Sequence, residues 1–595
     1  MLANARRCFL DVRKSATGLA WASRLDERGE RAALAMAQSE GLSEVVARVL
    51  AGRGVAPGEA ARFLQPTIRD LLPDPTVLTD MEAAAARLAD AVVRHERVAV
   101  FGDYDVDGAA SAALVARFVR HYGLEPEIYI PDRIFEGYGP NPTAMRELAK
   151  RGATLIVTVD CGTNSAEAIA AACEEGADVV VLDHHQLGGD LPPALAVVNP
   201  NRDDDLSGQG HLCAAGVVFL CLVRASRILR ARLPDAGSPD LMALLDLVAI
   251  ATVCDVVPLA GVNRAFVTRG LEIMRRNENL GLAALTQASR IGEPLNPYHL
   301  GFLLGPRINA GGRIGDAALG SRLLASASLD ECEAIAVTLE RLNRERQAIE
   351  EEMLTQARAE AEAELRQGAG PAVLVTASDQ WHPGVVGLIA SRLKDQARRP
   401  AFAIAFNADG VGTGSGRSVA GFDLGCLVRE AVAAGLLVKG GGHAMAAGLT
   451  VARDNLGRLR AFFEEQATDA VERLRADESL AIDAALSAEG ATEQLLDLLE
   501  QAGPYGSGHP APVFALPRHR IADLRVVGSG HMQVDLRAPG GGRIKAIAFR
   551  AADTPLGDFL AAHRGSTVHA AGSLSANHWN GARSVQFKLC DAAPA

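Results

Sequence analysis

The chain has 595 residues, of which 48% are hydrophobic and 22% charged, and its formal net charge is −12. Because single hydrophobic cores stop growing at about 250–300 residues, we expect several domains with the composition of an ordinary globular protein, and we exclude a disordered or fibrous chain. The acidic total argues against a general nucleic-acid coat, although a local basic groove is compatible with it.

The N-terminal segment, to about residue 75, is expected to consist of helices and turns, with helix starts at Ser43 and Pro57. Acidic residues accompany its basic ones and its apolar patches are short, so neither a secretory signal nor a transit peptide fits. We therefore expect a cytoplasmic protein.

Residues 97–255 alternate between short β-rich runs and helical stretches. The β-rich runs are 98–101, 155–159, 179–182 and 194–198, and helices are expected over 109–122 and 165–175. This alternation predicts βαβ units and a parallel sheet. The long apolar stretch 241–257 is interrupted by Asp246 and Asp255, so we expect no membrane span.

The second half of the chain begins with residues 329–367, which predict one long amphipathic helix. We favour a solvated connector between domains over a coiled coil that binds a partner. A second α/β region starts with a strand at 372–376 and is rich in glycine around 410–416 and 440–442. After a helix at 492–502, short β-like runs to residue 591 predict a small antiparallel barrel.

Three carboxylates, of Asp103, Asp105 and Asp107, follow the first predicted strand. In an extended segment residues two apart point the same way, so we expect the three to converge. The motif also resembles the start of an EF-hand loop. That alternative fails because Leu114 occupies the position of the bidentate Glu and a strand precedes the loop.

Further acids and histidines follow later apolar runs: Asp160, the Asp183-His184-His185 triplet, and Asp255. Each alone would be read as a turn former or helix cap. Because the carboxyl ends of parallel strands share one edge of a sheet, we expect these side chains to meet there. Carboxylates buried together repel each other unless cations neutralise them, so the sequence predicts a binuclear divalent-metal site.

The donor set indicates which metal the site holds and what chemistry it performs. Carboxylate and imidazole donors favour Mn²⁺, with Mg²⁺ as the alternative, and zinc is not excluded. The nine cysteines form no CxxC pair, so a thiolate zinc site is not expected. Two such metals, about 3.5–4 Å apart, activate a bridging water for in-line phosphoryl displacement, so we expect phosphoester hydrolysis.

The order and spacing of these motifs resemble the RecJ family of the DHH phosphoesterase superfamily. Similarity extends over roughly residues 65–590 and includes the following segments: Pro131-Asp-Arg133, Gly137-Tyr-Gly139, 211–216, 305–313, 379–384, 414–418 and 441–448. The last three resemble the DHHA1 domain of that family. The resemblance implies metal ligands at Asp105, Asp107, Asp160, His184 and Asp255. It makes Asp103, Asp183 and His185 neighbours that orient ligands, join the metal site or contact phosphate.

Several residues outside the metal cluster are expected to bind the substrate. Arg307, Asn309 and Arg313 form a polar set that could neutralise a phosphate, the alternative being a helix cap with surface arginines. The resemblance adds Trp381, His382, Arg417, Ser418 and His443. We expect Arg417 to follow a glycine-rich turn and His443 to lie behind a phosphate-binding run of glycines. Neither run fits a P-loop, so triphosphate hydrolysis is not indicated.

The resemblance also implies the architecture of the whole chain, which is α/β and multidomain. The expected parts are an N-terminal helical segment (1–75), a parallel-sheet DHH catalytic domain (76–328), the connector helix (329–367) and an α/β DHHA1 domain (368–470). A linker helix and an OB-type β-barrel follow (471–595). The expected activity is that of a 5′→3′ exonuclease specific for single-stranded DNA, acting in repair and recombination. A single-strand-binding protein and a helicase are further expected partners.

The barrel is expected to bind single strands through a basic groove and aromatic side chains. Candidate contacts are Arg518, Arg520, Arg525, Lys545, Arg550, His578, Trp579 and Arg583, whereas Phe514 and Phe549 are expected to fill its core. Two alternatives stay open at this point. One is a DHH-family phosphodiesterase acting on short oligonucleotides or cyclic dinucleotides, and the other is a non-enzymatic replication scaffold.

Overall fold

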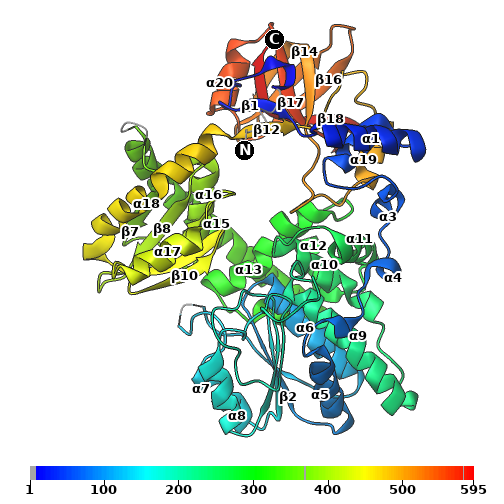
Figure 1. Cartoon of the computed structure of the whole chain (residues 1–595), viewed down its shortest axis with the longest axis vertical. Coiled ribbons are helices and arrows are strands. Elements are labelled where there is room, and N and C mark those ends of the chain that lie inside the picture. The colour runs from blue at the N-terminus through cyan, green and yellow to red at the C-terminus, as the bar shows by residue number, and fades with distance from the viewer. Residues whose placement is uncertain (1–7, 134, 367–369, 580–581) are drawn as a thin grey trace. The chain divides into compact units, whose positions relative to one another are not determined.

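The computed structural model describes residues 8–133, 135–366, 370–579 and 582–595. Its internal contacts divide the chain into two compact units, residues 71–476 and residues 1–70 together with 477–595. Figure 1 shows that the first contains two sheets covered by helices, and the second a barrel with the N-terminal helices. The side chains of His578 and Trp579, two candidate contacts, lie outside the described residues.

The first sheet of the 71–476 unit is parallel throughout and confirms the predicted βαβ arrangement. Its strand order is β3 (Glu127–Tyr129), β2 (Val98–Gly102), β4 (Leu155–Val159), β5 (Asp178–Leu182) and β6 (Ala196–Val198). Both faces are covered: α7 (Pro142–Lys150) and α8 (Ala166–Glu174) pack on one face. The other face carries α5 (Met81–Val93), α6 (Val106–His121) and α9 (Ala214–Arg232). Burial on both faces explains why the strands are apolar at nearly every position.

Helices continue the chain beyond this sheet. The apolar stretch expected to end in a strand before Asp255 is instead α10 (Leu245–Cys254), which packs against α6 and α11 (Gly261–Met274). All but the last residues of α10 are buried, so its sequence lacks the polar face that marks a helix. Next come α12 (Leu280–Ala288), the π-helix η5 (His299–Leu304), α13 (Gly305–Ile314) and α14 (Leu319–Ala325).

The expected long helix is present as α15 (Leu329–Leu365), capped by Ser328. Its first half packs against α12 and α13, and its second half packs against α16 (Val386–Ala397) and β7 (Leu374–Ser378). Met353, Ala357 and Ala361 are buried in the core that α15 shares with α16. The helix therefore joins two parts of one unit through apolar contacts and is not simply solvated.

The second sheet has the order β10 (Lys439–His443), β11 (Ala446–Ala452), β9 (Val411–Arg417), β8 (Ala401–Phe406) and β7, with α17 (Leu424–Ala433) and α18 (Leu456–Ala476) beside it. The expected glycine-rich turn before Arg417 is wrong, because these glycines form strand β9. A Cβ at Gly412 would lie 2.7 Å from Ile404, and one at Gly416 would overlap the ring of Phe402. The glycines make room for large side chains of β8.

The other unit confirms a small β-barrel at the C-terminal end of the chain. Its strands are β14 (Phe514–Val527), β15 (His531–Arg537), β16 (Arg543–Ala548), β18 (Ala582–Pro594) and β17 (Thr567–Trp579), and pairing of β14 with β17 closes it. The barrel is not wholly antiparallel, because β16 and β18 run parallel. Phe514 is buried as expected, whereas Phe549 is 55% exposed and lies against the ring of His531, so its expected place in the core is wrong.

The N-terminal residues pack against this barrel. Strand β1 (Ala20–Ser23) pairs in parallel with β12 (Ser479–Ile482), and the buried Trp21 donates a hydrogen bond of 2.9 Å to Asp591. Ser43 caps α2 (Glu44–Ala51) as expected, and α1 (Glu27–Ser39) packs beside it. The helix expected from Pro57 begins three residues later, as α3 (Ala60–Leu64).

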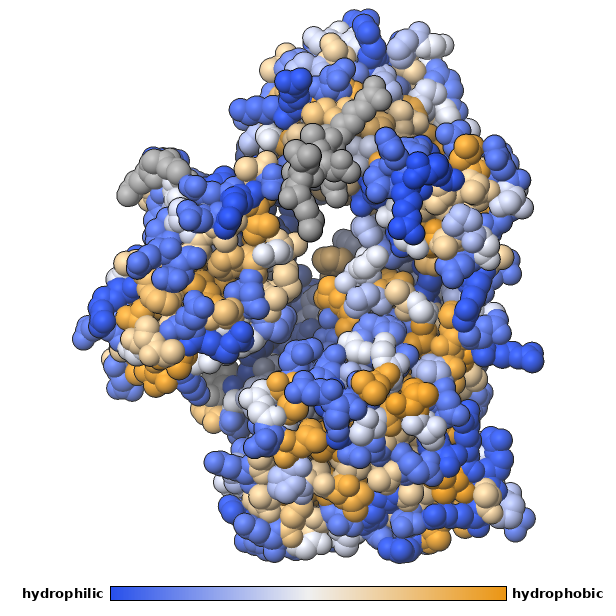
Figure 2. Space-filling model, in the orientation of Figure 1, coloured by the Kyte–Doolittle hydropathy of each residue, from blue (hydrophilic) through white to orange (hydrophobic). Residues whose placement is uncertain are grey.

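Hydrophilic residues cover much of the face shown in Figure 2, with smaller hydrophobic areas between them. Within the described residues, no helix is both long enough and apolar enough to cross a membrane.

The packing role of the β9 glycines predicts the effect of adding a methyl group. We expect Gly416→Ala to destabilise the second sheet by about 1–3 kcal/mol, because the methyl group overlaps Phe402. Gly448→Ala in the neighbouring strand is the matched control, since its nearest neighbour lies 4.0 Å from the added Cβ. Thermal unfolding and protease susceptibility of the second α/β region measure both. Equal behaviour of the two variants would reject the packing role.

Candidate metal centre

The first three carboxylates surround the junction between β2 and α6. Asp103 directly follows β2, Asp105 is the N-cap of α6, and Asp107 lies in its first turn. The expected extended geometry is therefore wrong. Asp105 accepts hydrogen bonds from the backbone N–H groups of Asp107 (2.9 Å) and Gly108 (3.2 Å). A Cβ at Gly108 would overlap the backbone of Asp103, so the tight turn requires glycine there.

Asp107 is fixed by a second helix. Its carboxylate accepts hydrogen bonds from the backbone N–H groups of Ala214 (2.7 Å) and Ala215 (2.8 Å), at the N-terminal end of α9. These N–H groups carry the positive end of the helix dipole and stabilise a buried negative charge. The contact holds Asp107 in place independently of any cation.

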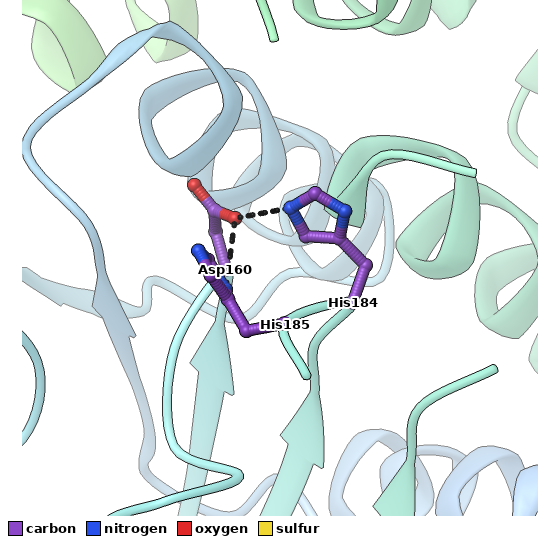
Figure 3. A group of neighbouring side chains, drawn as sticks. All are labelled: Asp160, His184 and His185. Carbon is purple, nitrogen blue, oxygen red and sulfur yellow. Dashed lines mark ion pairs between the residues drawn. The ribbon is translucent and has the colours of Figure 1, made fainter. Parts of the chain in front are cut away.

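Asp160 and His184 follow neighbouring strands, β4 and β5, and face each other (Figure 3). His184 Nε2 lies 3.3 Å from Asp160 Oδ1, while His185 Nδ1 lies 3.9 Å from the same oxygen. Asp160 is 2% exposed, and its Oδ1 has no hydrogen-bond partner among the described residues. Its φ angle of 60° is unusual for a residue with a side chain. Buried, unpaired and held in an unfavourable conformation, this carboxylate has the features of a ligand.

Asp183 binds protein groups on both oxygens. It accepts hydrogen bonds from the backbone N–H groups of Thr163 (3.0 Å) and His184 (2.7 Å), and it contacts His185 Nδ1 at 2.7 Å. These hydrogen bonds outweigh burial and hold the pKa of Asp183 well below its usual value. The Asp183 side chain thus holds the ring of His185 and the backbone at His184.

Asp255 completes the cluster from the C-terminal end of α10 and not from a strand end. Its Oδ2 lies 3.6 Å from His184 Nε2 and has no hydrogen-bond partner among the described residues. The next residue, Val256, is exposed and has a φ angle of 61°. A β-branched residue rarely adopts that conformation, so the backbone is strained directly beside this carboxylate.

Three overlapping sets of donor atoms could each hold a cation. They are Asp160, His184 and His185; Asp107, His184 and Asp255; and Asp103, Asp105 and Asp160. In each set the ligand atoms lie within 4.8 Å of one another. Because Asp160 and His184 each belong to two sets, the sets adjoin. Seven of the eight residues expected at the metal site thus meet in one place, and Asp183 supports them from behind.

Crowding of buried acids changes their protonation. Burial, followed by repulsion from the other carboxylates, raises the pKa of Asp107 to about 7 and that of Asp255 to about 9. The same causes raise the pKa values of Asp103 and Asp160 well above the usual range. Burial lowers the pKa of His184 to about 4. A neutral imidazole among carboxylates suits divalent cations, which would offset the repulsion.

Three arginines are close enough to influence one another, and one of them, Arg133, also interacts electrostatically with Asp103. Arg313 is held by a hydrogen bond to the carbonyl of Gly384 (3.1 Å), and the guanidinium of Arg133 lies 5.0 Å from the ring centre of Tyr104. Burial lowers the pKa of Arg313 to about 10, and the positive charges of Arg133, Arg346 and Arg417 contribute to that shift. None of the three forms an ion pair with a carboxylate in the described part of the chain. We call Arg133, Arg313 and Arg417 the arginine cluster.

The remaining candidate substrate residues have different surroundings. Arg307 forms an ion pair of 2.6 Å with Glu340 of α15, and the buried Trp381 donates a hydrogen bond to Gln356. Ser418 is buried and donates to the carbonyl of Phe422, while His382 accepts from Gly384 N–H. Asn309 has a buried side-chain oxygen without a partner among the described residues. His443 is at the surface, yet the protein atoms around its ring desolvate it and lower its pKa, and the charges of Arg417 and His185 lower this pKa further.

Two residues at the site belong to the segments 131–133 and 137–139, for which the sequence predicts a family resemblance but no site role. One is Arg133 of the arginine cluster. The other is Tyr138, whose hydroxyl donates to the carbonyl of Asp160 (3.3 Å) and lies 3.2 Å from the ring nitrogens of His185. Only the family resemblance of these segments could have indicated a role for the two residues at the site, because their proximity to the metal cluster depends on tertiary structure.

Comparisons with known proteins agree with this geometry. Family models match at residues 97–252 (DHH family, N-terminal domain), 370–469 (DHHA1 domain) and 482–591 (RecJ OB domain). The chain is 36% identical over 565 residues to the single-stranded-DNA-specific exonuclease RecJ of Dickeya dadantii, covering 92% of this chain and 96% of that protein. It is 36% identical over 561 residues to RecJ of Escherichia coli, covering 92% and 95%.

Solved structures give the same result. The crystal structure of RecJ in complex with Mn²⁺ from Thermus thermophilus has a TM-score of 0.78 and 30% identity, covering 96% of this chain and 78% of that one. The complex of RecJ from the same organism with Mg²⁺ has a TM-score of 0.73 and 29% identity, covering 97% and 78%. Two metals that oxygen ligands prefer are thus bound in structures similar to this chain.

The repulsion among the carboxylates predicts opposite effects of one substitution with and without metal. Asn tolerates the backbone conformation of Asp160, so Asp160→Asn removes the cost of burying this carboxyl group among other acids without adding strain. We expect the thermal midpoint in EDTA to rise by a few degrees, on the order of 1 kcal/mol, and the stabilisation by Mn²⁺ to shrink. Thermal unfolding with and without Mn²⁺ measures both.

The exposed Asp235 gives a matched control, because Asp235→Asn removes the same charge far from any donor set. It should change neither value. A lower midpoint of Asp160→Asn in EDTA, with undiminished stabilisation by Mn²⁺, would contradict a metal-binding role for Asp160.

Proposed function

The chain belongs to the RecJ family, and we propose on that basis that it is an exonuclease specific for single-stranded DNA, which hydrolyses phosphodiester bonds with two divalent metal ions. The observation that carries the proposal is the adjoining sets of carboxylate and imidazole donors, beside guanidinium groups that form no ion pair with a carboxylate of the described residues. Donors of this kind hold Mn²⁺ or Mg²⁺, and guanidinium groups bind phosphate.

The roles of the metal-site residues follow from their contacts. Asp105, Asp107, Asp160, His184 and Asp255 would hold the cations, with Asp103 and His185 at the margin. The bound metals supply a nucleophile at neutral pH and stabilise charge on the phosphate oxygens. Asp183 keeps His185 in one orientation through its hydrogen bond, and the N–H groups of α9 keep Asp107 in place.

The arginine cluster would bind the phosphate next to the scissile bond. Arg313 and Arg417 approach from different parts of the unit, so a phosphate between them would be held from two sides. His185 and His443 are further candidates for phosphate contact. The ion pair of Arg307 with Glu340, the hydrogen bond of Trp381 to Gln356 and the burial of Ser418 favour structural roles for these three.

The finer parts of the proposal rest on the family. We propose 5′→3′ polarity, a role in DNA repair and recombination, cytoplasmic localisation, and a single-strand-binding protein and a helicase as partners. Residues 76–328 would form the catalytic domain, 329–367 the connector and 368–470 the DHHA1 domain. Residues 471–595 would contain the linker helix and the OB domain, with the helical segment 1–75 before them all.

Digestion of end-labelled single strands in Mn²⁺ tests the metal mechanism. We expect His184→Ala and Asp160→Ala to abolish cleavage, because each residue contributes to two donor sets. Asp183→Asn removes only orientation and should lower the rate about 10- to 100-fold. Asp235→Asn should digest at the wild-type rate. A wild-type rate for His184→Ala would reject the two-metal mechanism, and an inactive wild-type chain would favour a scaffold.

Salt dependence tests the arginine cluster. Removing one phosphate contact should reduce the slope of log affinity against log salt concentration by about 0.7 for a single strand. We expect this reduction for Arg417→Ala and Arg313→Ala in the Asp160→Ala background, where cleavage does not interfere. Arg307→Ala is the matched control on the same helix as Arg313 and should leave the slope unchanged, because Glu340 already neutralises Arg307. Equal slopes in all three variants would reject the assignment.

A further inference from the structure

Two aromatic side chains lie stacked on the surface of the catalytic region. Tyr298 is 60% exposed and Phe302 is 69% exposed, and their ring centres are 5.2 Å apart at an interplanar angle of 23°. Only 4% of the residues in the chain are aromatic, so two large exposed rings side by side are notable. We call Tyr298 and Phe302 the aromatic pair.

The aromatic pair belongs to a segment that is fixed against the metal centre. It includes the first part of η5, a π-helix, and such turns occur frequently at functional sites. The sulfur of Cys254 lies 3.4 Å from the carbonyl of Leu300, and a Cβ at Gly301 would lie 3.4 Å from Val253. Val253 and Cys254 form the last turn of α10, directly before Asp255. The helix that presents the rings therefore packs on the helix that supplies a metal-site carboxylate.

The same helix continues without a break into α13. Within α13, Asn309 and Arg313 are four residues apart and lie on one face. Both are partly exposed, as Phe302 is exposed one turn before α13, whereas Ile308 and Gly312 are buried. One continuous helical segment thus has exposed aromatic rings near its start and a member of the arginine cluster near its end.

Aromatic rings followed by a guanidinium group match the bases and phosphates of single-stranded DNA. Guanidinium groups bind its phosphates, and aromatic rings stack on unpaired bases regardless of sequence. Between the two ends lies Asn309, whose side-chain oxygen has no hydrogen-bond partner in the part of the chain that the structure describes. A paired duplex could not use the rings, because its base faces are already stacked.

We propose that the aromatic pair stacks on bases of the strand whose phosphate is held at the arginine cluster. This inference rests on the proposed function and extends it, because it assigns a base-binding surface to the catalytic unit itself. The rings would prolong contact with a strand that has unpaired bases, and would contribute to the selection of single strands independently of the barrel.

Binding of a short 5′-phosphorylated thymidine oligonucleotide by the full chain, measured by fluorescence anisotropy in the Asp160→Ala background, tests the proposal. We expect Tyr298→Ala and Phe302→Ala each to weaken binding about tenfold, the loss typical of one stacked base. The Phe302→Trp variant should bind the oligonucleotide as tightly as the chain with Phe302 intact, because an indole ring also stacks on a base. The matched control is Val337→Ala, which removes an equally exposed apolar side chain from α15.

An oligonucleotide of the same length with abasic sugars separates stacking from structural damage. The alanine variants should bind it as well as the parent does, because it has no bases to stack. An equal loss on both oligonucleotides, or no loss on either, would overturn the proposal. Failure of the proposed function has a different signature, since the wild-type chain with Asp160 intact would then not degrade the thymidine oligonucleotide in Mn²⁺.

Discussion

The repulsion between carboxylates buried at one edge of a parallel sheet is the constraint on which the catalytic region depends. Asp103, Asp107, Asp160 and Asp255 all have raised pKa values because burial and mutual repulsion penalise their charges. The fold offsets part of this penalty with N–H groups from α9 at Asp107, whereas one oxygen each of Asp160 and Asp255 has no hydrogen-bond partner among the residues that the structure describes. These two carboxylate oxygens mark the positions where cations are required. Metal binding and the stability of this region are therefore coupled.

The sequence predicted which residues form the site more accurately than it predicted the helices and strands that carry them. The rule that parallel strands end at a common edge located Asp160 and His184 correctly, because β4 and β5 do end there. It failed for Asp107 and Asp255, which helices supply. An apolar run buried on every side, such as α10, has no polar face, so its periodicity cannot distinguish a helix from a buried strand. Convergence still occurred, since the ends of α6 and α10 reach the same edge.

Residue type alone could not tell a structural role from a functional one where the role depends on contacts between residues far apart in the sequence. Arg307 and Arg313 lie six residues apart on one helix and were equivalent by sequence alone. Arg307 meets Glu340 of α15, whereas Arg313 meets a carbonyl and other cations. The glycines of β9 likewise make room for Ile404 and Phe402, which belong to the neighbouring strand β8 and not to the glycine-rich segment itself. Such partners are set by tertiary structure and leave no local signal.

The acidic total of −12 and a nucleic-acid substrate are reconciled by local charge. Five carboxylates surround the metal centre, and two divalent cations would neutralise four of their charges. The three guanidinium groups of the arginine cluster then make the local charge positive. Other acidic residues form ion pairs with basic ones. Glu340 of α15, for example, pairs with Arg307 of α13 and with Arg344 of α15. Local positive charge from the arginine cluster and from bound metal would therefore attract a phosphate, although the chain as a whole is acidic.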